Sequence, residues 1–528
     1  MIKRLILPLL IACPQLLAAQ PHTSKIAPLD GERWWGGMVA LGSEMPFAAN
    51  TRVYDLNTEN HNNQTAPLLL SSAGRYVWSE QPFRFQFRND TLLLSSDYCK
   101  VEAVDAGNTL KDAYMAASRK HFPPNGKTPE SLFFCQPQYN TWIELMYDQN
   151  QKDILDYARQ ALANGFPPGI FMVDDNWQRY YGNFDFKAEK FYDPKAMCDE
   201  LHSMGFKIML WVSPFYSADT PEFREMQRKG YLLKDKTSGN AAIIKWWNGY
   251  SACLDTTNPE AVAFFKSKLE STMRRYGVDG FKFDAGDICY LTGDYAYFDK
   301  TADKHTFSQR WAEIGASFRF NELRAAWKTG GMPIVQRLGD KPYSWRSSSL
   351  IIPDMCAAGL LGYAYTCPDM IGGGEFQSFL NIGGKQLDEE LIVRSCQIHA
   401  MMPMMQFSVA PWRVLSKGNM EICNRYAKLH EQMGNYILRC AMQASQTGEP
   451  IVRSMEYAYP RQGFEECKDQ FMLGSRFLIA PMVSKGSKRV VRLPKGVWKD
   501  DQGKAIHGPK TFVVKVPLER LPYYELIE

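Results

Sequence analysis

The chain has 528 residues, of which 45% are hydrophobic and 22% charged, so it can bury a large core and is long enough for more than one domain. Lys and Arg number 61 against 57 Asp and Glu, a net charge of +4, and no long basic run is present. This balance gives no reason to expect nucleic acid or an anionic membrane surface as a partner.

Residues 1–19 are predicted to be a signal peptide. The basic pair Lys3-Arg4 precedes an apolar run over residues 5–12, and the small residues Ala18-Ala19 end the segment, which favours cleavage after Ala19. The stretch that ends at Cys13 also resembles a lipoprotein signal, so a lipid anchor at Cys13 is the alternative. No later apolar run is long enough to cross a bilayer. We therefore expect an exported protein, either periplasmic or secreted.

Cysteine and histidine usage indicates no metal site. Without Cys13, 11 of the 12 cysteines remain, with neither a CxxC pair nor the spacing of zinc ligands. Cys135, Cys253 and Cys367 lie in apolar runs, so we expect buried thiols and few or no disulfides. Only 8 histidines are present, which disfavours His-ligated metal and His general-base chemistry. We expect no metal or other cofactor.

Residues 20–125 are predicted to form an N-terminal β-sandwich. Short apolar or alternating segments are separated by turn residues, a pattern typical of antiparallel sheets. A connecting helix is expected over residues 111–119, before the breaker HFPPNG at 121–126. The candidate strands include residues 37–41, 75–78, 83–87 and 91–94.

Residues 126–460 change to apolar strands that alternate with amphipathic helices. Eight strand-then-helix units are the count of a (β/α)8 TIM barrel, with an open α/β sheet as the structural alternative. Helices are expected over residues 153–164, 259–276, 307–327 and 389–400. The candidate strands are residues 132–135, 170–173, 207–211, 278–283, 333–336, 361–367, 402–407 and 451–455.

Residues 461–528 return to short strands and predict a C-terminal β-domain of one or two small sandwiches. The expected strands are residues 471–473, 476–481, 489–492 and 511–516. The predicted fold class is therefore α/β, with a central barrel between two β-rich regions.

Polar and aromatic residues follow almost every strand of the predicted barrel. The carboxyl ends of parallel strands meet at one end of a barrel, where catalytic groups are set. These side chains therefore predict a cleft ringed by acids and indoles, although Asp369 is interpreted as a turn or scaffold carboxylate. They are Trp142, Asp174, Asp175, Trp211, Asp284, Arg337, Asp340 and Asp369.

Two carboxylates that flank a glycosidic bond are sufficient for sugar hydrolysis; they lie about 5 Å apart in retaining enzymes and about 6.5–9.5 Å apart in inverting ones. Asp284 is the candidate nucleophile, because Lys282 lies two residues back on the same face of the strand, where it would favour an ionised carboxylate or bind a sugar hydroxyl. Asp340 is the candidate acid/base, which requires a partly desolvated site beside another negative charge. Asp287 is the rival acid, or a helix cap.

Other residues in the predicted cleft fit a sugar ligand. Asp174 and Asp175 can accept hydrogen bonds from vicinal hydroxyls. Indole rings offer flat apolar faces to sugar C–H groups; they are Trp142, Trp211, Trp246 and Trp247. The expected partner is an oligosaccharide or other glycoside.

Motifs along nearly the whole mature chain resemble glycoside hydrolase family 31. They are RWWGG at 33–37, APLLLSSAGRYVW at 66–78, LWVSP at 210–214, DGFKFD at 279–284, PDMIGG at 368–373, LIAPMV at 478–483 and LPKGVW at 493–498. The resemblance implies a retaining α-glycosidase with Asp284 as nucleophile and Asp340, in an Arg-x-x-Asp motif, as acid/base. It also implies that Trp142, Trp247 and Arg324 contact the sugar.

Within that family the chain is similar to an α-galactosidase-like branch, so an exo-acting α-galactosidase is the first expectation. The motifs usual for α-glucosidases are missing; MQFS at 405–408 stands where a late Arg-x-His would fall. An α-glucosidase or α-xylosidase remains the alternative within the family. A catalytically silent glycan-binding protein is the alternative from a different class.

Overall fold

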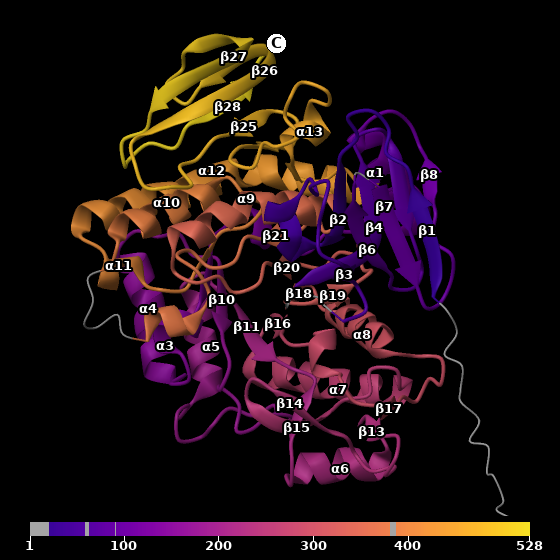
Figure 1. The fold of residues 1–528 in the computed structure, drawn as a ribbon. Helices are drawn as coiled ribbons and strands as arrows, with labels where there is room; N and C mark the ends of the chain where they lie inside the picture. Colours follow the sequence, from indigo (N-terminus) through magenta and orange to yellow (C-terminus); the bar gives the residue numbers. More distant parts are fainter. Residues whose placement is uncertain (1–20, 59–62, 90, 381–386) are drawn as a thin grey trace, which may run out of the picture.

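The computed structural model describes residues 21–58, 63–89, 91–380 and 387–528. The predicted signal peptide, residues 1–19, lies outside the described residues. N-terminal sheets (indigo) and a C-terminal sheet (yellow) pack against a central barrel (magenta to orange), as Figure 1 shows. Within the described ranges, no helix is both long and apolar enough to cross a membrane.

The central sheet of the described chain is eight-stranded and parallel, which confirms the predicted (β/α)8 barrel. Its strand order is β22-β9-β10-β11-β16-β18-β20-β21. A parallel bridge between Met370, just after β21, and Gln406 of β22 joins the two ends of the sheet. All carboxyl ends therefore open on one side. The strands are β9 (Gln138–Asn140), β10 (Ile170–Val173), β11 (Lys207–Val212), β16 (Gly280–Phe283), β18 (Phe320–Leu323), β20 (Gln336–Arg337), β21 (Thr366–Cys367) and β22 (Gln406–Phe407).

Helix α7 (Pro259–Tyr276) occupies the predicted range and shows why these residues form a helix. The side chain of Asn258 caps the first turn, Pro259 fits the first helical position, and Gly277 ends the helix in the left-handed conformation. The other main helices of the barrel are α4 (Gln151–Ala163), α5 (Pro194–Ser203), α8 (Lys304–Ala316), α9 (Trp345–Leu360), α10 (Glu389–Ala400) and α12 (Lys417–Thr447).

Four predicted elements were wrong. Residues 37–41 were expected to be a strand, but the strand ends at Met38 and residues 39–41 belong to the 3-10 helix η1 (Val39–Glu44). Residues 132–135 form the short helix α2 (Leu132–Cys135), whose apolar run fills the core as a helix instead of a strand. Helix α8 ends at Ala316, and residues 320–323 are strand β18 instead of its continuation. Residues 452–453 form β23 (Val452–Arg453), which pairs with the C-terminal sheet and not with the barrel.

Two barrel strands were not predicted, β9 and β18, and they are polar because they face a polar barrel interior. Gln406 of β22 donates from Nε2 to Glu322 Oε2 of β18 and to Gln138 Oε1 of β9, both at 2.9 Å. Asn140 of β9 donates to Gln406 Oε1 at 3.2 Å. Buried polar side chains are stable when they satisfy one another in this way.

The N-terminal region contains two sheets that pack face to face. Gly37 of β2 lies against Phe85 of β6; a Cβ at Gly37 would be 3.1 Å from the Phe85 ring. Helix α1 (Leu110–His121) then leads to the barrel, as predicted. One sheet contains β1 (His22–Ile26), β7 (Thr91–Ser96), β6 (Arg84–Arg88) and β3 (Tyr54–Asp55), and the other contains β2 (Trp34–Met38), β4 (Gln64–Ser71), β5 (Arg75–Trp78), β8 (Ala103–Asp105) and β19 (Ala326–Trp327).

The N-terminal sheet and the barrel share one strand pairing. Strand β19 comes from the barrel segment after β18 and pairs in parallel with β4. Gln64 of β4 donates from Nε2 to the backbone oxygens of Arg324, at 2.7 Å, and Arg337, at 3.0 Å. The N-terminal region is thereby fixed to the two barrel segments that follow β18 and end β20.

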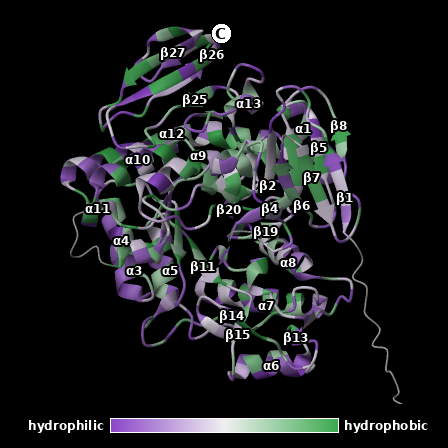
Figure 2. Ribbon diagram, viewed as in Figure 1, coloured by the Kyte–Doolittle hydropathy of each residue, from purple (hydrophilic) through white to green (hydrophobic). Residues whose placement is uncertain are grey.

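The predicted C-terminal β-domain corresponds to one six-stranded antiparallel sheet within the described residues. It has its own apolar core around Met455, Leu478 and Trp498. Figure 2 shows hydrophobic residues gathered in strands such as β7 and β11. The sheet order is β23, β24 (Phe471–Leu473), β25 (Phe477–Ile479), β28 (Tyr523–Leu526), β26 (Lys488–Asp500) and β27 (Ala505–Lys515).

An insertion between β11 and α7 brings a hairpin to the open end of the barrel. Strands β14 (Ile243–Trp246) and β15 (Gly249–Cys253) are joined by a tight turn with Trp247 and Asn248 at its tip. The insertion also contains β12 (Phe215–Ser217) and α6 (Pro221–Lys229).

Candidate active site

A cavity of about 410 Å³ opens at the carboxyl end of the barrel strands. Both candidate catalytic carboxyl groups and most of the expected sugar-binding residues line it, whereas Trp246 and the rival acid Asp287 do not. The predicted residues that line it are Trp142, Asp174, Asp175, Trp211, Trp247, Lys282, Asp284, Arg324 and Asp340. The rule that catalytic side chains follow parallel strands thus located one site from residues far apart in the sequence.

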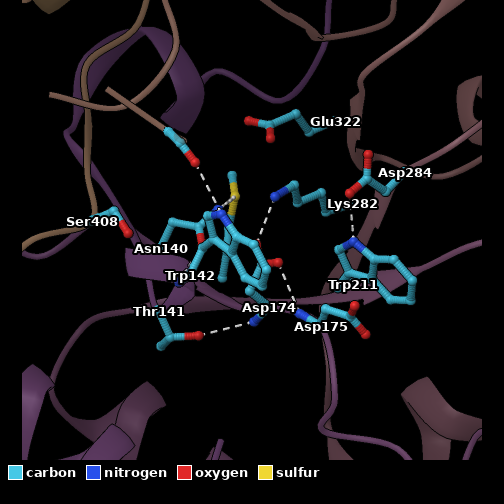
Figure 3. Close-up of polar contacts among 12 residues, drawn as sticks. Asn140, Thr141, Trp142, Asp174, Asp175, Trp211, Lys282, Asp284, Glu322 and Ser408 are labelled. Atoms are coloured by element: carbon cyan, nitrogen blue, oxygen red, sulfur yellow. Dashed lines mark hydrogen bonds and ion pairs between the residues drawn. The ribbon is translucent and has the colours of Figure 1, made fainter. Parts of the chain in front are cut away.

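Asp284, directly after β16, is held as an anion. Trp211 Nε1 donates to Asp284 Oδ2 at 2.6 Å (Figure 3). The backbone N–H of Ala285 donates to Asp284 Oδ1 at 3.0 Å. Burial opposes ionisation, but nearby charges and the indole N–H outweigh it, so the pKa of Asp284 lies below its usual value. The charges are those of Lys282, Arg324 and Arg337.

Lys282 lies in the barrel interior beside Asp284, as the alternation of β16 predicts. Its Nζ forms an ion pair with Asp174 Oδ2 at 2.6 Å, and both side chains are almost fully buried (Figure 3). The Asp174 backbone N–H donates to Thr141 Oγ1 at 2.9 Å. Asp174 is therefore fixed at the floor of the cavity and neutralises Lys282.

Asp175 has a different environment from Asp174. Asn248 Nδ2 donates to Asp175 Oδ2 at 2.7 Å, and Tyr181 OH lies 3.2 Å from Oδ1. Burial and the charge of Asp174 raise the pKa of Asp175 to about 7. At neutral pH this carboxyl group can therefore either donate or accept a hydrogen bond. Tyr147 OH donates to Asn248 Oδ1 at 3.2 Å, which ties the hairpin tip to the opposite wall.

Arg324 follows β18 and connects three groups. Its Nε lies 3.9 Å from Asp284 Oδ1 and 3.3 Å from Asp287 Oδ2, and its guanidinium carbon is 4.8 Å from the ring centroid of Trp247. Trp247 is 37% exposed, so one face of its indole remains open to a ligand.

Asp287 is buried behind Arg324 and does not line the cavity. Ala285 and Gly286 both adopt positive φ, 56° and 80°, and this turn folds Asp287 back towards Arg324. Asp287 is therefore not placed to protonate a leaving group.

Asp340 lies at the cavity wall after β20, and its side chain is 31% exposed. The sequence analysis expected a negative charge beside it. The structure instead places the Arg337 guanidinium in direct contact, with NH1 2.6 Å from Asp340 Oδ1. The same nitrogen lies 3.0 Å from Asp369 Oδ1, so the negative charge of Asp369 shares this cation with Asp340.

Two aromatic groups flank the cavity. On one side the rings of Trp142, Tyr147 and Phe376 pack edge to face, with centroids 5.3–6.0 Å apart. On the other side Trp247 packs against Tyr290 at 5.6 Å. Flat apolar faces on both sides suit the C–H surfaces of a sugar.

Trp246 was wrongly expected to contact the ligand. It is 4% exposed, stacks on Phe215 at 4.4 Å and donates from Nε1 to Ser251 Oγ at 3.1 Å. Strand alternation in β14 points it inward, where it supports Trp211.

The sequence analysis left several lining residues out of the site. Arg337 was predicted at the cleft as a strand-end residue but was given no role, although its position three residues before Asp340 was a usable signal. The lining residues that were not predicted come from loops and short 3-10 helices, where no period or strand end marks them. They are Tyr147, Tyr290, Glu375, Phe376 and Gln377.

A (β/α)8 barrel with paired carboxylates and indole rings at its strand ends is the architecture of a glycoside hydrolase. Residues 137–439 match the glycosyl hydrolases family 31 TIM-barrel domain, and residues 448–525 match the family 31 C-terminal domain. Because the first match covers more than half of the chain, the protein belongs to glycosyl hydrolase family 31.

Among its relatives, the myogenesis-regulating glycosidase of Mus musculus is 29% identical over 427 residues, which is 79% of this chain and 59% of that protein. Alpha-xylosidase XylQ of Lactiplantibacillus pentosus is 24% identical over 489 residues, 84% of this chain and 60% of that protein. This chain therefore spans about 60% of the length of these two relatives.

Solved structures share the fold. The family 31 dextranase FjDex31A of Flavobacterium johnsoniae, complexed with glucose, superposes with a TM-score of 0.81 at 20% identity and covers 96% of this chain and 66% of its own. A family 31 alpha-xylosidase from a soil metagenome, complexed with xylose, superposes with a TM-score of 0.82 at 20% identity. This match covers 96% of the present chain and 79% of the xylosidase chain.

Proposed function

We propose that the protein is a retaining, exo-acting α-glycosidase with Asp284 as nucleophile and Asp340 as acid/base. One observation carries the proposal: both carboxyl groups line the same cavity in different surroundings. Asp284 is buried among cations and an indole N–H that favour the anion, whereas Asp340 is partly open to the cavity. A two-carboxylate mechanism requires such unequal partners.

In the proposed first step, the ionised Asp284 attacks the anomeric carbon while Asp340 gives its proton to the glycosidic oxygen. The bond between that oxygen and the anomeric carbon breaks, and a glycosyl ester forms on Asp284. In the second step, Asp340 takes a proton from water, whose oxygen attacks the anomeric carbon and breaks the ester bond. The product keeps the α configuration and both carboxyl groups return to their initial states.

Charges in the cavity support this division of roles. Lys282 and Arg324 stabilise the carboxylate that Asp284 regains at the end of each turnover. Asp174 and Asp175 offer hydrogen-bonding oxygens to sugar hydroxyls, and Trp247 offers an apolar face. The link from Tyr147 through Asn248 to Asp175 restricts one side of the cavity, which favours a terminal sugar over an internal one.

The first substrate to test is an α-galactoside, because the KFDAG and Arg-x-x-Asp motifs resemble an α-galactosidase-like branch of the family. α-Xylosides and α-glucosides are the second candidates, because alpha-xylosidases and Alpha-glucosidase 2 of Bacillus thermoamyloliquefaciens are among the relatives. A catalytically silent glycan-binding protein would bind these sugars without turnover.

A panel of nitrophenyl α-glycosides tests the proposal. We expect release of nitrophenol from at least one α-glycoside, its loss in Asp284→Ala, and an α-configured first product by proton NMR. A 2-deoxy-2-fluoro glycosyl donor should label Asp284. Labelling of another residue would reject the assigned nucleophile, a β product would reject retention, and binding without turnover would favour the silent protein. Export is an expectation that cell fractionation can test separately.

A further inference from the structure

Arg337 is shared by three carboxyl groups at the floor of the cavity. Its NH1 lies 2.6 Å from Asp340 Oδ1 and 3.0 Å from Asp369 Oδ1, and its Nε lies 3.5 Å from Glu322 Oε1. The Arg337 side chain is 2% exposed, so water does not screen these contacts appreciably.

This arrangement poses a problem for an acid catalyst. An opposite charge in direct contact favours the ionised form of a carboxyl group. Arg337 alone would therefore hold Asp340 as an anion, whereas the first step of glycoside cleavage needs it protonated. Another group must reduce the attraction of Arg337 for the Asp340 anion.

Asp369 is fixed in the position where it can do this. Its Oδ2 accepts hydrogen bonds from the backbone N–H groups of Lys341, at 2.8 Å, and Gly374, at 3.1 Å. These bonds leave Oδ1 directed at Arg337 NH1. Asp369 also adopts a φ of 76°, uncommon for a residue other than glycine, which indicates that the surrounding structure imposes its orientation.

We propose that Asp369 is a positioning residue that shares the charge of Arg337 with Asp340 and so leaves Asp340 able to carry the catalytic proton. The inference rests on the proposed function, since it concerns how the acid/base of that reaction is kept protonated. Glu322 acts in the same direction from the Nε side, more weakly because of its longer distance.

The other charged groups around Asp340 do not replace Asp369. Arg324, from the segment after β18, adds positive charge that Asp284 and Asp287 share. The Lys341 ammonium is committed to Asp354 at 2.7 Å. Glu375 lines the cavity but makes its side-chain hydrogen bond with Ser378. Burial and the neighbouring charge of Asp340 raise the pKa of Asp369 to about 6, so Asp369 is ionised at neutral pH, when it is needed.

Asp369→Asn removes the charge and keeps the shape. Arg337 then acts more fully on Asp340, and the basic limb of the kcat/KM profile should move about one pH unit lower. Asp255→Asn is the matched control, because Asp255 is similarly buried and accepts hydrogen bonds from backbone N–H groups but forms no ion pair within the described ranges of the chain. Glu322→Gln should move the basic limb of the profile in the same direction by a smaller amount. It provides the test if Asp369→Asn does not fold.

The outcomes separate the inference from the proposed function. If the wild type cleaves α-glycosides and the Asp369→Asn and Glu322→Gln profiles coincide with that of Asp255→Asn, the inference is overturned while the proposed function stands. If the wild type cleaves none of them, the proposed function fails. Titration of Cγ-¹³C-aspartate by NMR, with the Asp340 signal assigned through Asp340→Asn, then decides the charge sharing. A lower Asp340 pKa in Asp369→Asn supports it, and an unchanged value overturns it.

Discussion

Trp211→Phe should shift the acid limb of the pH–activity profile because it removes the indole N–H that donates to Asp284 Oδ2 at 2.6 Å. Hydrogen bonds to charged groups contribute about 1.5–3 kcal/mol, and one pKa unit corresponds to about 1.4 kcal/mol. Loss of this bond should therefore raise the pKa of Asp284 by about 1–2 units. The phenyl ring keeps part of the apolar contact, so the fold should persist.

The assay is kcat/KM between pH 4 and pH 8 with the aryl α-glycoside that the wild type cleaves best. A raised Asp284 pKa means that the ionised nucleophile is lost at a higher pH. The ratio of wild-type to Trp211→Phe activity should therefore be nearly constant towards pH 8 and grow as the pH falls towards 4.

Trp246→Phe provides a matched control. Trp246 lies beside Trp211 with ring centroids 6.5 Å apart and is similarly buried, but its N–H donates to Ser251 instead of a carboxylate. Both substitutions remove the same atoms from neighbouring sites. If both variants lose activity by one constant factor at every pH, the hydrogen bond does not control Asp284 and the reasoning is refuted.

Three further changes test other contacts. Asp287→Asn removes the carboxylate 3.3 Å from Arg324 Nε and should raise KM about tenfold with a smaller effect on kcat, measured with the same substrate. Burial, followed by the charge of His430, lowers the pKa of His399 to about 3. Because the unfolded chain then binds a proton that the folded chain does not, His399 should lower the free energy of unfolding by about 1.4 kcal/mol per pH unit below pH 6.5. His399→Leu should reduce this slope in urea titrations. Gly374→Ala places a Cβ 2.6 Å from Asp369 Oδ1 and 2.9 Å from Asp340 Oδ1, so kcat should fall at least tenfold.

Each change has an outcome that contradicts it. An Asp287→Asn enzyme with wild-type KM would mean that Arg324 needs no buried counter-charge. A His399→Leu protein whose stability falls as steeply with acid as the wild type would place the acid sensitivity elsewhere. For Gly374→Ala, the control is Gly418→Ala, where an added Cβ has no heavy atom within 4 Å; equal kcat in both variants would show that the cavity wall accommodates the methyl group.

Local signals were sufficient to predict most of the barrel. Apolar runs located β10, β11 and β16, and the Asn258 cap with Gly277 at the other end bounded α7. Strands β9 and β18 could not be predicted in this way, because strands that face a polar interior have no apolar run. Glu322 and Gln138 each accept a hydrogen bond from Gln406, which is more than 80 residues away, and no local pattern carries that information.

The site could be predicted as far as strand ends define it. Asp284, Asp340 and their predicted neighbours follow strands, so topology brought them together. Tyr147 and Phe376 come from loops, and their places depend on tertiary packing. The contact between Asp369 and Arg337 could not be predicted from the sequence. Only the folded chain shows that one guanidinium nitrogen of Arg337 contacts both Asp340 and Asp369.

The amide of Gln64 has a consequence for how the protein can be divided. It is fully buried and donates hydrogen bonds to the backbone carbonyl groups of Arg324 and Arg337. The side chains of these two arginines lie beside Asp284 and Asp340, respectively. A fragment that began after the leading sheets would leave both carbonyl groups without this donor and would expose the strand edge that β4 now covers. The leading sheets therefore support the wall of the cavity directly, and we expect a chain without them to lose the backbone geometry at Arg324 and Arg337.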